Sequence, residues 1–485
     1  MTSTLLNAAT TPTIAIVGGG CSGALVATHL LKTATQPLTI KLIERSYPIG
    51  KGIAYSTDDT CHLLNVSAGN MSAFPNDPGH LLRWLQHNRN ALKPLLRSEV
   101  NPSTFIPRKV YGLYIQSILA EAEATALSDV RLERLIDEVV AIAPSPDNAI
   151  IDLKSGQSFS ADQVVLAVGN APQPPFNDPK ASYGRNAWSA DALKDLDQDA
   201  PVLIIGTGLT MVDMVLSLHE RQHRGKIYAV SRRGLFPQRH QATKSYPSFL
   251  TPATAPTTAR SLLHRVRAEI KSAVSRGYDW RAVIDSLRPI TQQLWQKLSR
   301  VEQRRFLLHV APYWDVHRHR IAQQVANTVA ELLESGQLTI TAGRIKDYQV
   351  VPDGVEVTVR QRKTQTNTVF KVSRVVSCTG ITADYAKFDH PLISSLRSQG
   401  LIHPNSIGLG LDAADNGALL SADGEISHLF YTLGTPRKGN LWETIAVPEI
   451  RGQAQNLAET LLQSLPLYIR SIPTIHPYYS DIEDS

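Results

Sequence analysis

Two glycine-rich segments of this 485-residue chain have the residue types and spacing of sites that bind dinucleotides. The first, residues 18–23, reads GGGCSG, so Gly18, Gly20 and Gly23 supply the pattern G-x-G-x-x-G. In such a turn the first glycine allows a tight bend, the second lets the backbone approach a pyrophosphate, and the third lets helix and strand pack closely. The free N–H groups at the start of the helix, where Ser22 lies, favour the negative charge of a diphosphate.

Glu44 supplies an acid at the position that such a site needs. It closes the next short apolar run, 21 residues after Gly23, where a carboxylate can accept hydrogen bonds from ribose hydroxyls. Arg45 follows it and is counted with the same site. A glycine turn that serves packing alone is the alternative, but the strand, the helix and the acid together favour a bound dinucleotide.

The second glycine-rich turn, at residues 206–211, reads GTGLTM. Gly206 and Gly208 match the first two glycines of the pattern, whereas Met211 replaces the third small residue. Helix and strand must then stand slightly further apart, so this motif alone is less specific than the first.

A pair of arginines near the second turn predicts which dinucleotide it binds. Ser231, Arg232 and Arg233 stand where a site for NAD would carry an acid. Guanidinium groups bind a 2′-phosphate through charge-assisted hydrogen bonds worth ~1.5–3 kcal/mol each. The second site is therefore predicted to take NADPH, the alternative being a pair of charges in solvent. With an acid at the first turn, FAD is expected there and NADPH at the second.

The elements that must hold these two turns follow from the hydrophobic pattern. Each turn lies between a short β-branched run and a helical segment that leads to a second short run, so the chain contains two separate βαβ units. Strands are expected at 13–17, 39–43, 202–205 and 226–230, and helices at 21–31 and 210–221.

The remaining pattern divides into β-rich and helical stretches. Residues 256–335 are helical, with apolar residues every four positions and Gly336 as a stop signal. Leu262, Val266, Ile270 and Val274 are expected to face the core. Strands are expected at 149–153, 157–160, 164–168, 338–341, 355–359, 369–372 and 375–377, and a last helix, with Pro448 in its first turn, at 448–462.

Two further turns suggest how the chain is divided. Residues 167–169 and 378–380 end buried strands at Gly169 and Gly380, and they look like the turns by which two-dinucleotide flavoproteins return the chain between their domains. The predicted fold is α/β, with two Rossmann-like dinucleotide-binding domains and a helical insertion. The expected limits are 1–199 and 373–465 for the FAD-binding domain, 200–372 for the NADPH-binding domain with its insertion at about 256–335, and 466–485 for a C-terminal tail.

Several further segments resemble an FAD/NAD(P)-binding family that includes FAD-dependent urate hydroxylase and L-aspartate N-monooxygenase. The resemblance runs from about residue 13 to 460 and is specific for the flavoprotein class rather than for a substrate. The segments that carry it are GKGIAYS at 50–56, HLLNV at 62–66, MSAFP at 71–75, WDVHRHR at 314–320, WET at 442–444 and VPEIR at 447–451.

The resemblance implies FAD, a reduced nicotinamide and O₂. We therefore expect an NADPH-dependent monooxygenase that oxygenates a small polar or anionic substrate through a flavin hydroperoxide. The cofactor carries this chemistry, so no side-chain nucleophile is expected. Two alternatives stay open: an NADPH oxidase or electron-transfer flavoprotein, and a non-catalytic FAD-binding redox sensor.

Four residues are candidates for catalysis or substrate binding. The resemblance places His62 and Asn65 along the flavin, where they could hydrogen-bond its ring or the substrate, unless they form an ordinary polar turn. Arg318 and Arg320 could meet an anionic substrate or the cofactor phosphates, or could make salt bridges between domains. Metal binding is not expected, because His317 and His319 would point to different sides of a helix.

The composition excludes several other classes. Three distant cysteines, Cys21, Cys61 and Cys378, provide no disulfide framework, zinc cluster or dithiol, although Cys61 beside His62 could act as a single reactive thiol. The net charge of +6 suits an anionic cofactor, and no nucleic-acid partner is expected. Without a signal-peptide pattern or an apolar run near the ~20 residues that cross a bilayer, we expect a cytoplasmic protein without a membrane anchor.

Overall fold

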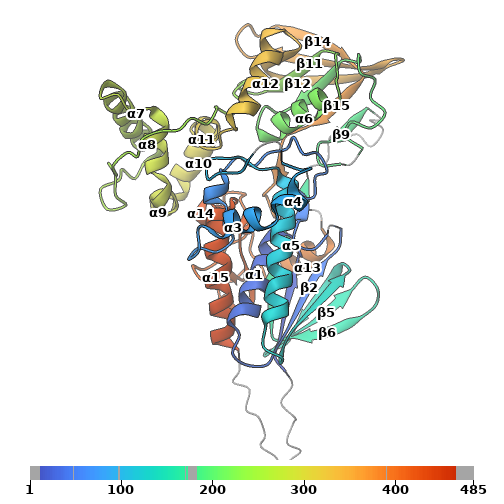
Figure 1. Ribbon diagram of the computed structural model, residues 1–485, viewed down its shortest axis with the longest axis vertical. Coiled ribbons are helices and arrows are strands. Elements are labelled where there is room, and N and C mark those ends of the chain that lie inside the picture. The colour runs from blue at the N-terminus through green and yellow to red at the C-terminus, as the bar shows by residue number, and fades with distance from the viewer. Residues whose placement is uncertain are drawn as a thin grey trace, which may run out of the picture.

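Two large sheets, each packed against helices, two small antiparallel sheets and a lobe of helices make up the described part of the chain (Figure 1). In this computed structural model, the described residues are 11–46, 48–96, 99–169, 171–172, 183–189, 191–388 and 390–465. The expected tail at 466–485 lies outside them. Within these residues, every helix is too short or too polar to span a bilayer.

The first sheet has six strands, and the strand that precedes the first glycine turn lies near its middle. Four of its five pairings are parallel, and β17 runs antiparallel at one edge. Ile14 and Ile16 are fully buried, as expected for a strand covered on both faces. In sheet order the strands are β17 (Ala418–Leu420), β18 (Ile426–Thr432), β7 (Gln163–Leu166), β1 (Thr13–Val17), β2 (Leu38–Glu44) and β3 (Val130–Ile136).

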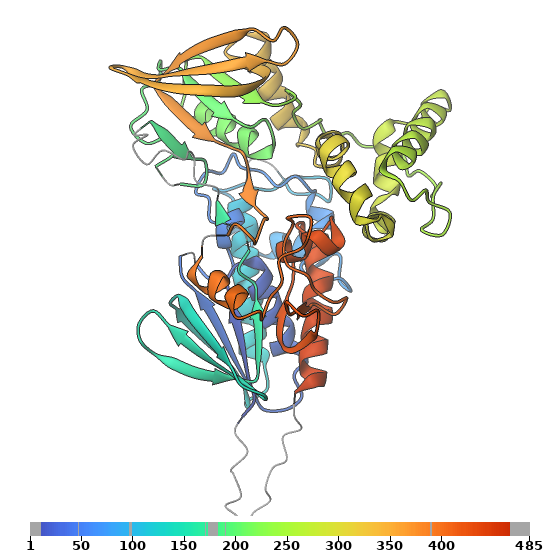
Figure 2. The same ribbon diagram turned by 180° about the vertical axis from the view of Figure 1, so that it is seen from behind.

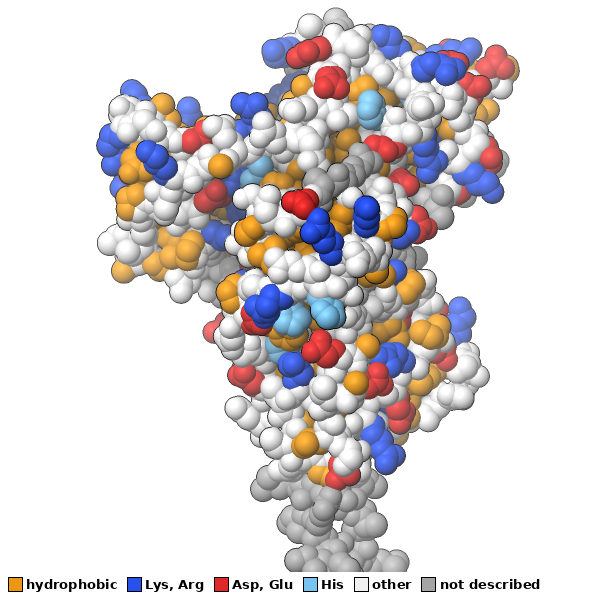
Figure 3. Space-filling model, viewed as in Figure 1, with side chains coloured by type: hydrophobic (Ala, Val, Ile, Leu, Met, Phe, Trp, Pro, Cys, Tyr) orange, Lys and Arg blue, Asp and Glu red, His pale blue; other side chains and the backbone are white. Residues whose placement is uncertain are grey.

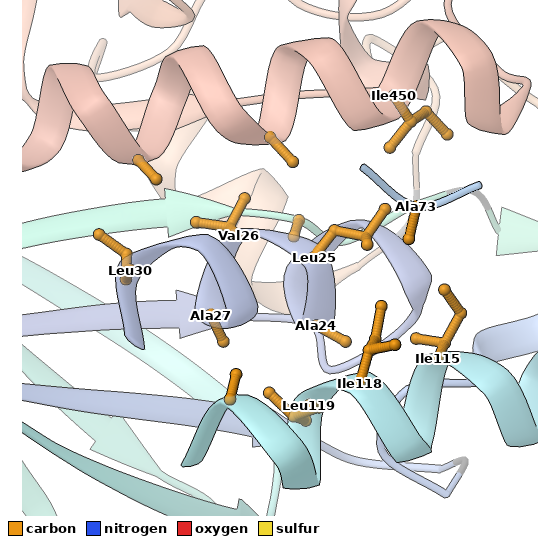
Figure 4. Packing of buried hydrophobic residues seen from close by; sticks show 14 of the residues in the cluster. Ala24, Leu25, Val26, Ala27, Leu30, Ala73, Ile115, Ile118, Leu119 and Ile450 are labelled. Atoms are coloured by element: carbon orange, nitrogen blue, oxygen red, sulfur yellow. The ribbon is translucent and has the colours of Figure 1, made fainter. Parts of the chain in front are cut away.

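Three long helices cover one face of this sheet, as Figure 1 shows. They are α1 (Cys21–Thr33), α5 (Arg108–Thr125) and α15 (Val447–Ser464). In Figure 4, α1 lies between the other two, with Leu25 and Val26 facing α15 and Ala24 and Ala27 facing α5. The opposite face is covered by an antiparallel sheet of β4 (Val139–Pro144), β5 (Ala149–Leu153) and β6 (Ser158–Ala161).

The second sheet has seven strands, and the second glycine turn follows its β10. Five adjacent strands are parallel, and an antiparallel hairpin extends one edge. Helix α6 (Leu209–Glu220) packs on this sheet together with α12 (Gln323–Glu334). In sheet order the strands are β14 (Asn367–Val372), β13 (Gly354–Gln361), β12 (Leu338–Val351), β11 (Ile227–Ser231), β10 (Val202–Ile205), β15 (Arg374–Ser377) and β9 (Gly184–Asn186).

The predicted fold class is confirmed, but the sheets divide the chain differently from the expected limits. Strand β9 precedes the limit at 199 and β15 follows the limit at 372, yet both pair within the second sheet. Assigned by pairing, the second sheet therefore takes strands from 184 to 377. The expected limits differ because the sequence of a short parallel strand does not indicate which sheet the strand joins.

The helical lobe is shorter than expected. It projects to one side in Figures 1 and 2, whereas α12 leaves it and packs Val325 and Val329 against α6. Val274, expected in the core, is 54% exposed. Figure 3 shows Lys and Arg side chains over the lobe surface. The lobe consists of α7 (Ala259–Ser275), α8 (Trp280–Ser286), η2 (Arg288–Ile290), α9 (Thr291–Lys297), α10 (Arg300–His309) and α11 (Ala311–Arg318).

Buried His29 makes the stability of the first unit pH-dependent. It lies in α1, where Nε2 has no hydrogen-bond partner among the described atoms, and burial lowers its pKa from 6.5 to about 4. Because the unfolded chain binds the proton more tightly, stability should be full above pH 6.5 and should fall by about 1.4 kcal/mol per pH unit as the pH drops towards 4. Denaturant unfolding of the wild type and of His29→Gln at pH 7 and pH 5 measures this: the wild type should lose about 2 kcal/mol more than the variant. Equal losses of stability in the wild type and in His29→Gln would contradict this role of His29. His87→Gln, which changes an exposed histidine, serves as the control.

Candidate functional site

The first glycine turn has the geometry of a phosphate-binding turn. Gly18 has φ +109°, and a Cβ there would lie 2.3 Å from the carbonyl oxygen of Ala167. A Cβ on Gly23 would lie 2.0 Å from the oxygen of Gly18. A Cβ on Gly20 would be in ordinary contact with Cα of Gly52, at 3.4 Å. Gly18 and Gly23 are thus required by packing, whereas the lack of a side chain at Gly20 leaves room for a ligand at the helix N-terminus.

Glu44 is held at the edge of this turn. Its Oε2 accepts a hydrogen bond from the N–H of Gly19 at 3.0 Å, and its Oε1 accepts one from the N–H of Ser46 at 2.9 Å. These bonds fix both carboxylate oxygens beside the turn and leave further lone pairs for ribose hydroxyls. The geometry fits the expected role of Glu44.

The start of α15 lies beside the start of α1. A Cβ on Gly434 would be 3.2 Å from Oγ of Ser22, and the N–H of Gly434 donates to Oε1 of Gln453 in α15. Pro448 stands in the first turn of α15. Two helix N-termini therefore meet near the first glycine turn, where both favour negative charge.

The other residues expected at the FAD site are distributed differently. Gly169 follows β7 in the left-handed region (φ +64°), and its carbonyl oxygen accepts a hydrogen bond from Oη of Tyr385 at 2.6 Å. Arg45 is committed elsewhere, because its Nη1 donates to Oε1 of Glu138 at 3.0 Å and lies 2.7 Å from Nε2 of His390. A direct role for Arg45 with a cofactor has no support in this geometry.

The second glycine turn repeats the first. Gly206 has φ +107°, and a Cβ there would lie 2.3 Å from the oxygen of Cys378, in the turn that ends at Gly380. Around Gly208, apart from its chain neighbours, no atom of the described residues lies within 4 Å of a Cβ position. Met211 is fully buried among the apolar residues of α6 and α12. The second turn therefore has the same open approach to a helix N-terminus.

Ser231 organises the rim of the second turn. Its Oγ accepts hydrogen bonds from Oγ1 of Thr207 at 2.8 Å and from the N–H of Gly234 at 3.0 Å. The two arginines after it differ. Arg233 donates from Nη2 to the oxygen of Leu308 at 2.7 Å, whereas the exposed Arg232 side chain has no partner among the described residues. Arg232 is the freer of the two to bind a 2′-phosphate, because one N–H group of Arg233 already bonds to the helical lobe.

This asymmetry predicts unequal effects on coenzyme choice. Arg232→Ala should lower kcat/KM for NADPH about 10- to 100-fold and leave that for NADH nearly unchanged, since only NADPH carries the 2′-phosphate. Arg233→Ala should have the smaller effect on coenzyme choice but should also lower Tm, because it holds the helical lobe. Steady-state kinetics at low and high salt, with thermal melts, check this. Equal losses for both coenzymes in Arg232→Ala would contradict it.

His62 is a contact between the two sheet units. Its Nδ1 lies 2.8 Å from Oγ1 of Thr57, and its Nε2 lies 2.8 Å from Oγ of Ser217 in α6. Nearby, Arg108 and Asp213 form an ion pair at 3.0 Å, also between the units. Since both ring nitrogens already have partners, a role of His62 at the flavin is not supported by the geometry. The sequence could not predict that Ser217, 155 residues away, is the partner of His62, because no local pattern connects the two residues.

The three cysteines offer no reactive thiol that the geometry favours. Cys61 is buried against the second unit, and burial raises the pKa of Cys21 to about 12 and that of Cys378 further. Asp59, Cys61 and His62 place one ligand atom each within 4.8 Å of one another, the only such group of three among the described residues. The hydrogen bonds of His62 to Thr57 and Ser217 compete with any metal there.

Asn65 lies at the meeting of three parts of the chain. Its backbone oxygen is 3.2 Å from Nε2 of His240, whose pKa is lowered to about 4 by burial and by the charge of Arg320. Arg320 is 3% exposed and pairs with Asp285 of α8. The structure thus brings two predicted residues, Asn65 and Arg320, close to the same histidine.

Arg318 lies where the helical lobe meets the chain before α15. The carboxylate of Glu443 accepts a hydrogen bond from Nε1 of Trp314 at 2.8 Å and lies 3.9 Å from Nη2 of Arg318. Trp442, next to Glu443, has φ +61°, an uncommon conformation for a side-chain-bearing residue. Two of the segments that carried the resemblance, 314–320 and 442–444, therefore meet in one buried contact.

Comparisons with known proteins identify the class. The FAD-NAD(P)-binding family model matches residues 15–171, and the model of the L-lysine 6-monooxygenase/L-ornithine 5-monooxygenase family matches residues 95–326. No curated protein matches the chain by sequence. The two family matches confirm the expected enzyme class, an FAD- and NAD(P)H-dependent monooxygenase.

Solved structures share this fold over nearly the whole chain. The reduced form of ornithine hydroxylase from Pseudomonas aeruginosa aligns with a TM-score of 0.63 at 13% identity, covering 94% of this chain and 100% of that one. L-lysine 6-monooxygenase from Pseudomonas syringae aligns at 0.62 and 17%, covering 94% and 100%. The FAD-bound cadaverine monooxygenase from Erwinia amylovora aligns at 0.61 and 14%, covering 98% and 100%.

Proposed function

We propose that this protein N-hydroxylates a primary amine of a small amino acid or diamine, with FAD at the first glycine turn and NADPH at the second. The observation that carries the proposal is the match to the L-lysine 6-monooxygenase/L-ornithine 5-monooxygenase family over residues 95–326. That segment includes the second glycine turn and the whole helical lobe. The structural neighbours act on ornithine, lysine and cadaverine, all of which carry a primary amine.

The residues of the chain fit both cofactors. Gly20 and Gly208 carry no side chain that would keep a diphosphate from two separate helix N-termini. Glu44 would hold the ribose of FAD, and Arg232 would hold the 2′-phosphate that marks NADPH. The start of α15, at Pro448, would stabilise negative charge on the reduced flavin.

The reaction balances as an oxygenation. Bound FAD and NADPH would supply the two electrons, so that an amine, O₂, NADPH and one proton would give a hydroxylamine, NADP⁺ and water. The chain contributes placement of the amine and exclusion of bulk water. An amine must lose its ammonium proton before it can be oxygenated.

A screen of amines tests this function. FAD-loaded enzyme with NADPH and O₂ is assayed for hydroxylamine product with L-ornithine, L-lysine, cadaverine and L-aspartate, and for NADPH oxidation. L-Aspartate is in this panel because of the resemblance to L-aspartate N-monooxygenase. The resemblance to urate hydroxylase adds urate as a further substrate. We expect one amine to raise the rate of NADPH oxidation and to be converted to its hydroxylamine.

Two results would replace the proposal. If urate alone is oxygenated, the enzyme is a ring hydroxylase of the urate kind. If NADPH is consumed at the same rate with and without every amine, and all O₂ becomes hydrogen peroxide, the protein is an NADPH oxidase.

A further inference from the structure

The helical lobe holds the positive charge of this chain. Residues 259–318 contain twelve lysines and arginines against five aspartates and glutamates, a net charge of +7, whereas the whole chain has a net charge of +6. The remainder of the chain is therefore close to neutral. Such an imbalance places a positive electrostatic field around one part of the surface.

Most acids of the lobe are neutralised within the structure, whereas many of its cations are not. Ion pairs join Glu269 to Arg265 and Arg276, Asp279 to Arg281, Asp285 to Arg320 and Glu302 to Arg305. Five exposed cations of the lobe form no ion pair with any described residue, namely Arg260, Arg267, Lys271, Lys297 and Arg304. The charge of these five side chains faces solvent.

Three of these free cations lie along one side of α7. Arg260, Arg267 and Lys271 follow one another after seven and four residues, so they share one face of the helix. Arg260 stands in the first turn, which holds no acid, at the end of the helix where the dipole disfavours a cation. Arg267 and Lys271 are like charges one turn apart. Both arrangements oppose the local stability of α7, which indicates that its charge serves something outside the helix.

The lobe is attached to the rim of the second glycine turn through α10. Nη2 of Arg233 donates to the backbone oxygen of Leu308 in α10 at 2.7 Å, and its guanidinium lies 5.4 Å from the centre of the Tyr313 ring in α11. Helix α7 is joined to α10 in turn, because the N–H of Ala259 donates to Oε2 of Glu302 at 2.9 Å. The free cation Arg304 stands one turn before Leu308. A positive surface therefore adjoins the turn at which the coenzyme is proposed to bind.

We infer that the helical lobe steers the anionic coenzyme to the second glycine turn. NADPH is negative at its diphosphate, and its 2′-phosphate adds about 1.5–2 negative charges. A positive surface beside a site raises the association rate of such a ligand, by roughly 10- to 1,000-fold in strong cases. NADH lacks the 2′-phosphate, so steering favours NADPH already at the association step.

The inference rests on the proposed function, in which NADPH binds at the second turn, and it adds a part for the lobe. The association of NADP⁺ with the oxidised, FAD-loaded enzyme tests it, because NADP⁺ keeps the phosphates of NADPH and cannot reduce the flavin. Stopped-flow fluorescence of protein and flavin, without an amine, gives kon and koff separately.

Salt should weaken association in the wild type. The Debye length falls from about 30 Å at about 0.01 M salt to about 3 Å at about 1 M, and kon for NADP⁺ should fall at least about tenfold over this range. The decrease should be smaller for NAD⁺, which has no 2′-phosphate.

Removal of the free charges of α7 separates steering from contact. The triple variant Arg260→Gln, Arg267→Gln, Lys271→Gln should lower kon for NADP⁺ about three- to tenfold at about 0.01 M salt. It should change koff less than about twofold, because steering acts before the coenzyme is bound. At about 0.15 M salt, where the Debye length is about 8 Å, the loss in kon should shrink.

Two matched variants test whether the charge and its place are responsible. In the first, the three positions of α7 exchange arginine for lysine and lysine for arginine, which keeps their charge, and kon should stay at the wild-type value. The second removes three exposed cations of the first unit, at the end of α1, in β3 and after β5, and should change kon less than about twofold. Its substitutions are Lys32→Gln, Arg131→Gln and Lys154→Gln.

Two results would overturn the inference. One is a kon of the α7 triple variant equal to that of the wild type at low salt. The other is a raised koff with an unchanged kon, which would make α7 a direct contact of the bound coenzyme. Because association is measured without an amine, this failure is distinguishable from that of the proposed function. A hydroxylamine formed by an enzyme whose kon does not depend on the lobe would leave the function standing and remove only the steering.

Discussion

Gly20→Val is expected to give a folded protein that is colourless. Gly20 has φ −68° and ψ −170°, which a valine adopts readily, and a Cβ there would meet Cα of Gly52 at 3.4 Å, an ordinary contact. The side chain would instead fill the approach to the N-terminus of α1, where the diphosphate of FAD must lie. Steric overlap between the valine and the diphosphate, at a cost of about 1–3 kcal/mol in binding free energy, corresponds to roughly 10- to 100-fold weaker binding of FAD.

The measurement is flavin absorbance per folded protein after purification, with circular dichroism and thermal melting. Gly23→Val is the matched comparison, since a Cβ there would lie 2.0 Å from the oxygen of Gly18 and should disrupt the fold itself. Full flavin occupancy in folded Gly20→Val would contradict the assignment of FAD to the first turn.

Gly208→Val should leave the protein yellow and stop its reduction by NADPH. In the part of the chain that the structure describes, nothing beyond the neighbouring residues lies within 4 Å of a Cβ at Gly208, whose φ is −86°, so the fold and the first turn should remain intact. A valine would occupy the approach to the N-terminus of α6, and the rate of flavin reduction at subsaturating NADPH should fall roughly 10- to 100-fold.

Anaerobic stopped-flow absorbance measures this reduction directly. Dithionite, which needs no coenzyme site, should still bleach the flavin of Gly208→Val as in the wild type. Reduction by NADPH at the wild-type rate would show that the coenzyme binds elsewhere. Together with Gly20→Val, this variant assigns one cofactor to each turn.

The local part of this architecture is readable from the sequence. Strand β1 has the expected bounds, and the helices after the two glycine turns begin within one residue of expectation. The reason is that buried parallel strands consist of apolar β-branched residues, and the glycines that end them are required by contacts with Ala167 and Cys378. At these strands and turns, steric contacts between nearby residues determine the structure, so the sequence predicts it.

Helix α5 was missed although its signal is present. Val110, Tyr114, Ile118 and Ala122 recur every four residues and are all buried, which is the period of a helix packed on one face. In contrast, β12 continues ten residues beyond the expected end at 341. Its second half is mostly exposed, so neither face is marked by apolar residues.

The contacts that distinguish the candidate site join distant parts of the chain. Glu449 meets Arg288 across 161 residues, and His62 meets Ser217 across 155. Charged and polar side chains carry no periodic signal of burial, so their sequence context cannot indicate which partner they find. The arginines at 318 and 320 could be selected by type, but their carboxylate partners, Glu443 and Asp285, lie in other parts of the chain.

Incorporation of labelled oxygen tests the central claim most directly. The FAD-loaded enzyme is supplied with NADPH, ¹⁸O₂ and the amine that stimulates NADPH oxidation, and the product is analysed by mass spectrometry. The account predicts a hydroxylamine that carries one ¹⁸O atom, formed in proportion to the NADPH oxidised. Unchanged amine, with all of the label recovered in hydrogen peroxide, would contradict it.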